Sequence, residues 1–454
     1  MSVRAIGCSA LVTLVIVTAT ISAYPQGAPK QQTIPSRAPL LLHLTRSECP
    51  VRLGGVFLWG LGNQADPLFN SAKNAEQLSS GNRDWIAANC DVTALPSVCL
   101  TAKVYPWIVA KYPAFTGLLY LYASCLYSTQ HFGSAGVWDA SMTPDVLHNS
   151  AGEEVPFPGK NGHWMDFGSG SWARYWKKAA EEQCAKYDAQ GVVAAELPVN
   201  NTFVTPPQQY ARFDERADAT ARWLETAHDP AHTLLIPAAL DFERPADSAT
   251  LPPTIIEPQL QGTLWDAYFP LIDGAWLEGF ARPYWSGEPI GSHQWEIQME
   301  AMDRYGEAGQ VFVAMAAYSN TTQLEDDLAS YLLVVHHQGR AVFQPMPLSI
   351  KGHPDAGYSL AVLRQQVLEY PGYFNVPLGR PIQVRHMVPD GRLNVWVRKF
   401  QHGVVYFNSD DRGTLSVNLG SAMRRMNGSL ARRVTLPPMS GVVLLYSQNS
   451  ITHD

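Results

Sequence analysis

Two glutamates stand at the ends of apolar segments, where a carboxylate is available for chemistry. Glu278 ends the run Gly274–Glu278, and the alternation of an extended chain places it on the same face as Trp276. Glu196 ends a second such run, which begins at Gly191. A carboxylate in line with apolar side chains costs stability unless it is used or paired. For each glutamate the structural alternative is a bond to a neighbouring loop at the rim.

A pair of carboxylates is what the hydrolysis of a glycosidic bond requires. One protonates the leaving oxygen, while the other attacks carbon or activates water. Trp276 is an apolar neighbour that favours the protonated form of Glu278, so we expect Glu278 to be the general acid. Glu196 precedes Pro198 and the polar Asn200, a wetter setting that suits a nucleophile or base. The exchanged assignment is the alternative.

Aromatic rings and further carboxylates near the ends of the apolar runs are candidates for binding a carbohydrate, because flat amphipathic rings suit sugar faces. The chain carries 13 Trp and 19 Tyr, enough for such a role. Core packing is the alternative for each ring, and Asp166 is also placed to cap the helical run that follows it. The predicted substrate-binding residues are Trp59, Tyr122, Trp164, Asp166, Asp241 and Trp276.

Other site chemistries lack their motifs. The chain has no Cys-x-x-Cys, His-Glu-x-x-His, Gly-x-Ser-x-Gly or Walker sequence, and His336 lies in an apolar helical run where packing is expected. Gly168–Ala173 mimics a dinucleotide fingerprint, but no apolar strand leads into it. We therefore expect no metal and no cofactor. The net charge of −7, from 33 Lys+Arg against 40 Asp+Glu, argues against a nucleic-acid partner.

The elements that must position the two glutamates are short apolar runs alternating with amphipathic helical stretches, a pattern typical of a parallel sheet buried on both faces. Eight such strands close a (β/α)₈ TIM barrel, which we place at residues 54–350, with a doubly wound open sheet as the alternative. The predicted strands are Gly54–Gly60, Asp91–Leu95, Thr116–Ser124, Gly191–Leu197, Thr233–Leu240, Gly274–Phe280, Gln310–Tyr318 and Arg340–Met346. The predicted helices include Ser171–Lys186, Asp214–Thr226, His293–Tyr305 and Gln323–His337.

After Pro347 the pattern changes to short runs of alternating character, separated by Asp-Gly, Asp-Asp-Arg-Gly and Pro-Pro turns. Such runs predict a small C-terminal antiparallel β-sandwich domain over residues 375–447. The runs are Leu393–Lys399, Val404–Phe407, Leu415–Leu419 and Gly441–Tyr446.

The N-terminus has the pattern of a secretory signal peptide over residues 1–23, with Arg4 before an apolar stretch and Ala23 at a small-residue cleavage site. A flexible lead-in follows over residues 24–53. An uncleaved signal anchor is the alternative; otherwise we expect a secreted or lumenal protein with no membrane span. Three sequons are compatible with export and predict glycosylation at Asn200, Asn320 and Asn427.

Five cysteines remain once Cys8 leaves with the signal peptide. In an oxidising compartment some of them are expected to form disulfides, and the odd number leaves at least one thiol over. Cys90 and Cys99, nine residues apart, are the predicted pair.

The motif Asp273–Glu278 resembles the Asp-Gly-Val-Phe-Leu-Asp/Glu signature of the glycoside hydrolase-like barrel proteins, most nearly hypothetical glycoside hydrolase family fifteen. Similar to that family are also Trp164–Phe167 before a helix, Leu378–Pro381 after the barrel, and Arg398–Asn408 at the entry to the C-terminal domain. The resemblance covers residues 54–446 and implies a secreted barrel with a glycosidase site.

The chain departs from the family pattern at one point. Ala195 stands where the family has a carboxylate, and Glu196 comes one place late. A shift of one residue turns a side chain to the other face of a strand, unless a bulge or the end of the strand re-aims it. We therefore expect a secreted glycoside hydrolase-like enzyme acting on a poly- or oligosaccharide. The alternative is an inactive barrel that binds glycans through its rim aromatics.

Overall fold

The computed structural model describes most of the chain from residue 49 to residue 447. The described ranges are 49–58, 61, 78–128, 133–155, 157, 162–197, 210, 213–229, 234–238, 263–284, 286–336, 340–348, 356–388 and 395–447. The predicted signal peptide, most of the lead-in, Trp59, Asn200 and Asp241 lie outside them. Within these ranges no helix combines the length and the hydropathy that crossing a bilayer would take.

Eight parallel strands form one sheet, in the spatial order β7-β6-β3-β2-β1-β10-β9-β8. Their bounds are β1 (Leu53–Val56), β2 (Cys90–Pro96), β3 (Thr116–Tyr122), β6 (Gly191–Ala195), β7 (Leu234–Pro237), β8 (Gly274–Leu277), β9 (Val311–Tyr318) and β10 (Arg340–Pro347). Each coincides with a predicted run. All residues of β2, β3, β6, β8 and β9 are buried, which explains why these strands are continuously apolar rather than alternating.

The sheet closes on itself almost completely. Its two outer strands, β7 and β8, meet through a parallel bridge between Ala238 and Trp276, and the amide of Asp273 donates to the carbonyl of Leu235 at 2.9 Å. This closure distinguishes the predicted barrel from the doubly wound open sheet, because an open sheet leaves its outer strands unpaired.

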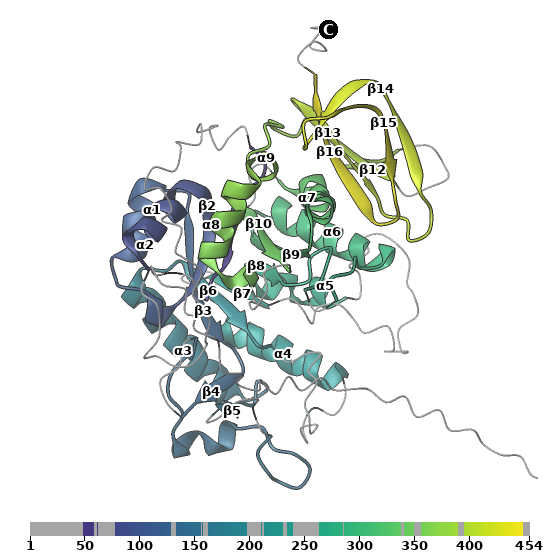
Figure 1. Ribbon diagram of the computed structural model, residues 1–454. Helices are drawn as coiled ribbons and strands as arrows, with labels where there is room; N and C mark the ends of the chain where they lie inside the picture. Colours follow the sequence, from purple (N-terminus) through teal and green to yellow (C-terminus); the bar gives the residue numbers. More distant parts are fainter. Residues whose placement is uncertain are drawn as a thin grey trace, which may run out of the picture. The chain divides into compact units, whose positions relative to one another are not determined.

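Helices surround the barrel strands in Figure 1. They are α1 (Ser80–Asn89), α2 (Val104–Lys111), α3 (Gly170–Tyr187), α4 (Phe213–Ala227), α5 (Leu264–Tyr268), α6 (Ser292–Glu307), α7 (Thr321–Val334), α8 (Leu360–Glu369) and α9 (Pro371–Phe374). Several begin at a Ser or Asn whose side chain accepts a backbone N–H: Ser79 for α1, Ser169 for α3, Asn320 for α7 and Ser359 for α8. The sequence patterns did not predict α8 and α9.

The C-terminal part is the antiparallel sheet that the sequence predicts, in the order β11-β12-β13-β16-β14-β15. Its strands are β11 (His386–Met387), β12 (Val395–Phe400), β13 (Gly403–Asn408), β14 (Leu415–Arg425), β15 (Leu430–Leu436) and β16 (Ser440–Tyr446). Apolar residues from five of these strands share one core, among them Val397, Val404, Met423, Val434 and Leu444.

Helix α7 lies between the barrel and the C-terminal sheet, packing against β9 and β10 on one side and β13 and β16 on the other. Ten of its eleven residues from Leu324 to Val334 are buried, and the carboxylates of Asp326 and Asp327 are among them. The guanidinium of Arg398 in β12 donates to the carbonyls of Leu332, Leu333 and Val335, at 3.1, 3.0 and 2.9 Å, and so caps the helix C-terminus.

The predicted disulfide is wrong, because Cys90 and Cys99 do not bond to each other. Cys90 begins β2 and Cys99 follows the end of this strand. The strand advances about 3.3 Å per residue, so its two ends lie roughly 20 Å apart. A disulfide needs Cα atoms within about 7 Å. The predicted strand Asp91–Leu95 lies between the two cysteines and is itself incompatible with this pairing.

Candidate active site

Glu278 directly follows β8, at the carboxyl end of the barrel strands where catalytic groups of this architecture project. Its side chain is half-buried. The phenol of Tyr358 donates a hydrogen bond of 3.0 Å to its Oε1 atom. Tyr358 ends the short 3₁₀ helix η4 (Ala356–Tyr358), which comes after β10, so the contact joins two strand ends.

Backbone contacts on both sides hold Tyr358 in place. Its carbonyl accepts the amide of Leu58 at 2.9 Å, and the carbonyl of Gly357 accepts Nε2 of Gln344 at 2.8 Å. Gln344 is itself buried in β10 and exchanges hydrogen bonds of 3.0 and 2.9 Å with the backbone of Val56 in β1. The phenol that reaches Glu278 is therefore fixed by the barrel interior.

Glu196 follows β6, whose last residue Ala195 pairs with Tyr122 of β3. The backbone of Glu196 is left-handed, with φ 59°. Outside glycine this conformation is uncommon and costs of order 1 kcal/mol or more, and it concentrates at functional sites. The left-handed backbone at the end of β6 therefore turns the Glu196 side chain away from the direction that alternation along the strand would give it. This turn compensates for the position of Glu196 one residue later than the carboxylate of the family pattern.

The charges of both glutamates affect the pKa of the same buried phenol, that of Tyr120. Burial raises the pKa of Tyr120 most, and the negative charges of Glu196 and Glu278 raise this pKa further. The Tyr120 ring lies 6.1 Å from that of Trp276, centroid to centroid, although their strands β3 and β8 are not neighbours. The contact therefore crosses the barrel interior. The two predicted carboxylates converge on one aromatic cluster at the barrel mouth.

The environment of Glu196 agrees only in part with the predicted one. The side chain is exposed to solvent, as the sequence predicts, while desolvation by the neighbouring protein raises the pKa of its carboxyl group. Glu196 in turn raises the pKa values of Cys125 and Tyr127, although burial is the larger cause for both. The solvent-exposed setting of Glu196 is therefore confirmed, and the direction of its pKa shift is the point in which the structure differs from the prediction.

The predicted rim aromatics within the described part of the chain belong to the packed wall of the mouth. Tyr122 is buried, and its carbonyl accepts the indole N–H of Trp176 at 2.7 Å. Trp164, also buried, lies in β5 (Gly162–Trp164), which pairs with β4 (Cys125–Tyr127) in the long insertion after β3. Trp276 is buried as well, with its ring 6.0 Å from Tyr358.

Asp166 shapes the loop before α3. Its carboxylate accepts the amide of Gly168 at 2.9 Å and the hydroxyl of Tyr210, while Ser169 serves as the N-cap. The alternative in which Asp166 caps the helix is therefore wrong, because Ser169 is the N-cap and the carboxylate of Asp166 bonds within the loop.

A possible metal-ligand set lies apart from the two glutamates. Within the described ranges, ligand atoms of Asp303, Glu307 and His336 come within 4.8 Å of one another. His336 contacts Asp303 at 2.5 Å, and Arg385 approaches Asp303 at 3.5 Å. Burial would raise the pKa of Asp303, but the bond to His336 and the charge of Arg385 leave this pKa lowered. With a fixed guanidinium beside it, the group is an ion-pair network.

Sequence reasoning missed Tyr120, Tyr358 and Gln344. The alternation in Thr116–Tyr122 carries a signal for the first, because it sets Tyr120 on the same face as Tyr122. No periodic pattern marks Tyr358, which comes from a 3₁₀ turn.

Two of the three sequons lie on the surface. Asn320 is exposed, and its side-chain oxygen accepts the amide of Gln323 at 3.0 Å. Asn427 is exposed in the turn between β14 and β15, where its side-chain oxygen accepts the amide of Ser429 at 3.0 Å.

Comparisons with known proteins give only distant likenesses. No family model matches the sequence, and no curated protein matches it. Among solved structures, the chain is similar to the glycoside hydrolase domain of PelA from Pseudomonas aeruginosa, with 15% identity and a TM-score of 0.39 over 66% of this chain and 96% of that one. An Anoxybacillus α-amylase gives 10% identity and a TM-score of 0.44 over 87% and 98%. The α-amylase of Geobacillus thermoleovorans gives 11% and 0.45 over the same shares.

These identities and TM-scores are low, so the strand topology described above carries the fold assignment. The resemblance to family fifteen stays a prediction.

Proposed function

We propose that the protein is a glycoside hydrolase that cleaves a glycosidic bond in a poly- or oligosaccharide with Glu196 and Glu278. The observation that carries the proposal is the position of the two carboxylates, since Glu196 and Glu278 each directly follow a parallel strand, β6 and β8, at the carboxyl end of the same barrel. Hydrolysis with a carboxylate pair uses water as its only co-reactant.

The environments of the two carboxylates divide the roles between them. We assign the general acid to Glu196, because desolvation raises the pKa of its carboxyl group and so favours donation of a proton to the leaving oxygen. Glu278 accepts a hydrogen bond from Tyr358, and such a donor stabilises a carboxylate in its ionised form. Ionised Glu278 then attacks the anomeric carbon or activates a water. This is the exchanged assignment that the sequence left as the alternative.

The test uses Glu196→Gln and Glu278→Gln, with Glu288→Gln as a matched control because Glu288 is an exposed glutamate of the same loop. A glycan panel first identifies a substrate. On a poor leaving group, Glu196→Gln should lower kcat by about 10²-fold or more, and on an activated aryl leaving group much less. Glu278→Gln should slow both. If both variants fold and keep full turnover, the proposal fails and a glycan-binding barrel takes its place.

The remaining sequence expectations belong to the same proposal. We infer export through the signal peptide, membership of the family-fifteen-like proteins, and a C-terminal sheet folded as a sandwich. The core shared by β12, β13, β14, β15 and β16 supports the sandwich. The mature protein should begin near Tyr24 and carry N-glycans at Asn320 or Asn427, as peptide mass spectrometry can show. An intact Met1 on an unglycosylated protein would contradict export.

A further inference from the structure

Backbone hydrogen bonds hold the loop that follows Glu278 against β9. The amide of Phe280 donates to the carbonyl of Met315 at 3.0 Å, and the amide of Ala317 donates to the carbonyl of Arg282 at 3.0 Å. Both partners lie in β9, so the loop continues along the neighbouring strand after β8 has ended. The position of Glu278 is therefore tied to the course of this loop.

The middle of the loop is strained and buried. Ala281 has φ 55°, a left-handed conformation that costs a side-chain-bearing residue of order 1 kcal/mol or more. Gln298 of α6 holds it from both sides: its Oε1 accepts the amide of Ala281 at 2.9 Å, and its Nε2 donates to the carbonyl of Gly279 at 3.1 Å. Such a conformation persists only where the surroundings determine it, so the contacts around it matter.

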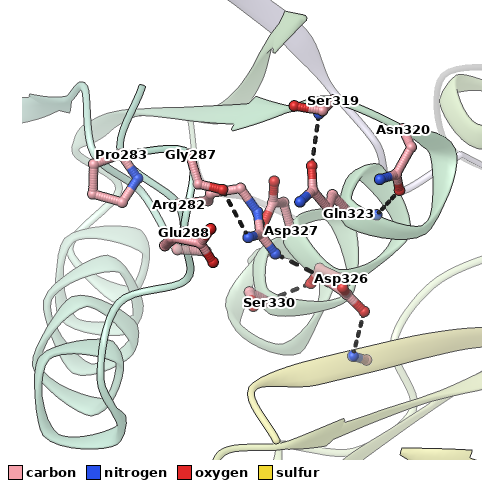
Figure 2. A network of polar contacts seen from close by, with 12 residues as sticks. Arg282, Pro283, Gly287, Glu288, Ser319, Asn320, Gln323, Asp326, Asp327 and Ser330 are labelled. Atoms are coloured by element: carbon pink, nitrogen blue, oxygen red, sulfur yellow. Dashed lines mark hydrogen bonds and ion pairs between the residues drawn. The ribbon is translucent and has the colours of Figure 1, made fainter. Parts of the chain in front are cut away.

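Arg282, the next residue, is the charged anchor of the loop. It is buried, and one guanidinium nitrogen donates to the carbonyl of Gly287 at 3.1 Å within the same loop. Two carboxylates of α7 face it: Asp326 at 3.8 Å and Asp327 at 3.6 Å (Figure 2). Asp326 also accepts the amide of Gly441 in β16 at 2.9 Å. The chain of contacts thus runs from the loop through α7 to the C-terminal sheet.

We propose that Arg282 is a positioning residue for Glu278, which anchors the loop after β8 to α7 and the C-terminal sheet. Placement of a catalytic group decides rates, and a displacement of about 1 Å can cost on the order of 10²-fold. The inference rests on the proposed function, because it assigns Arg282 a role in placing one of the two carboxylates. The geometry of the anchor itself stands independently of any substrate.

The test compares Arg282→Lys with Arg385→Lys. Arg385 is the matched control, since it is also largely buried and pairs with α6 carboxylates, Glu300 at 3.0 Å and Asp303 at 3.5 Å, away from the loop. A lysine keeps the charge of Arg282 but loses the planar fork. We expect Arg282→Lys to speed amide hydrogen exchange in residues 279–284 and to lower kcat about tenfold or more with KM unchanged. Arg385→Lys should leave both unchanged.

A second variant covers the case in which Arg282→Lys does not fold. Arg282→Met with Asp326→Asn and Asp327→Leu removes the buried guanidinium together with both carboxylates that face it, a change that folded proteins tolerate better than the loss of one partner, and it should loosen the same residues. Exchange in 279–284 equal to that of the wild type, in a folded variant, overturns the inference. The proposed function is judged separately, by Glu278→Gln on the same substrate, because the exchange measurement does not depend on turnover.

Discussion

At the residue scale, the raised pKa of Glu196 predicts a pH dependence of catalysis. A general acid must hold its proton, and burial raises the pKa of Glu196 above its ordinary value of 4.5. Turnover should therefore be lost as the pH rises through this raised pKa. With an activated aryl leaving group, which needs no proton, the loss should vanish. Profiles of kcat/KM against pH on the two substrates check this, and identical falling limbs would contradict the role of Glu196.

The phenol of Tyr358 gives a second prediction. Tyr358→Phe removes the donor that stabilises ionised Glu278, and a hydrogen bond to a charged group is worth about 1.5–3 kcal/mol. We expect a kcat at least about tenfold lower, with the rising limb of the pH profile moved to higher pH. Tyr331→Phe is the control, because its buried hydroxyl donates to the carbonyl of Ala341 at 3.0 Å. If Tyr358→Phe has the same kcat and the same pH profile as the wild type, the phenol of Tyr358 has no role in catalysis.

The residues of the candidate site differ in whether the sequence alone could predict them. Glu278 could be predicted because alternation along a strand is a local rule, and Trp276 two residues earlier fixes the face. The orientation of Glu196 could not be predicted, because the left-handed backbone of this one residue at the end of the strand decides it. The partner of Glu278 could not either, because Tyr358 stands 80 residues away in sequence and outside any periodic pattern.

At the element scale, Gly55 of β1 leaves room for the side chain of Gln344, which lies in the neighbouring strand β10. The φ of Gly55 is 142°, and a Cβ atom there would lie 2.1 Å from Oε1 of Gln344. Gly55→Ala should therefore lower the free energy of unfolding by about 1–3 kcal/mol. Gly81→Ala is the control: it lies in α1 with nothing within 4 Å of the added atom, and it should be neutral or stabilising. Urea denaturation measures both, and equal effects would contradict the close approach.

The elements themselves were predictable where burial imposes one character on a whole segment. Most residues of the barrel strands are apolar because both faces of the sheet are covered, as in β9, and the second half of α7, from Leu328, is largely apolar because α7 packs between two sheets. Strand β15 was missed because its exposed residues, Arg432 and Arg433 among them, carry no apolar run. The pairing of β15 with β14 depends on contacts that a local pattern does not record.

At the scale of the whole molecule, the contact between α7 and the C-terminal sheet predicts how stability depends on pH. Asp326 lies buried between Arg282 and the amide of Gly441, with the carboxyl groups of Glu325 and Asp327 beside it on α7. Burial raises the pKa of Asp326 from 3.8 to about 7, although Gly441 and Arg282 oppose the rise. One guanidinium faces two carboxylates, so one negative charge in this group has no opposite partner.

The direction of this pH dependence follows from the difference between the pKa of Asp326 in the folded and in the unfolded chain. A group whose pKa is higher in the folded than in the unfolded chain contributes stability that is fully present below about pH 4 and is lost as the pH rises to about 7. Asp326→Asn keeps an oxygen for the amide of Gly441 but cannot ionise, so the fall in stability between these two values should become smaller. Denaturation midpoints from pH 4 to pH 8 measure this for the wild type, for Asp326→Asn and for Asp84→Asn, a control in the exposed first turns of α1. If the denaturation midpoint of Asp326→Asn falls with pH as steeply as that of the wild type, another group is responsible for the titration. The contact between α7 and the C-terminal sheet then does not depend on the charge of Asp326.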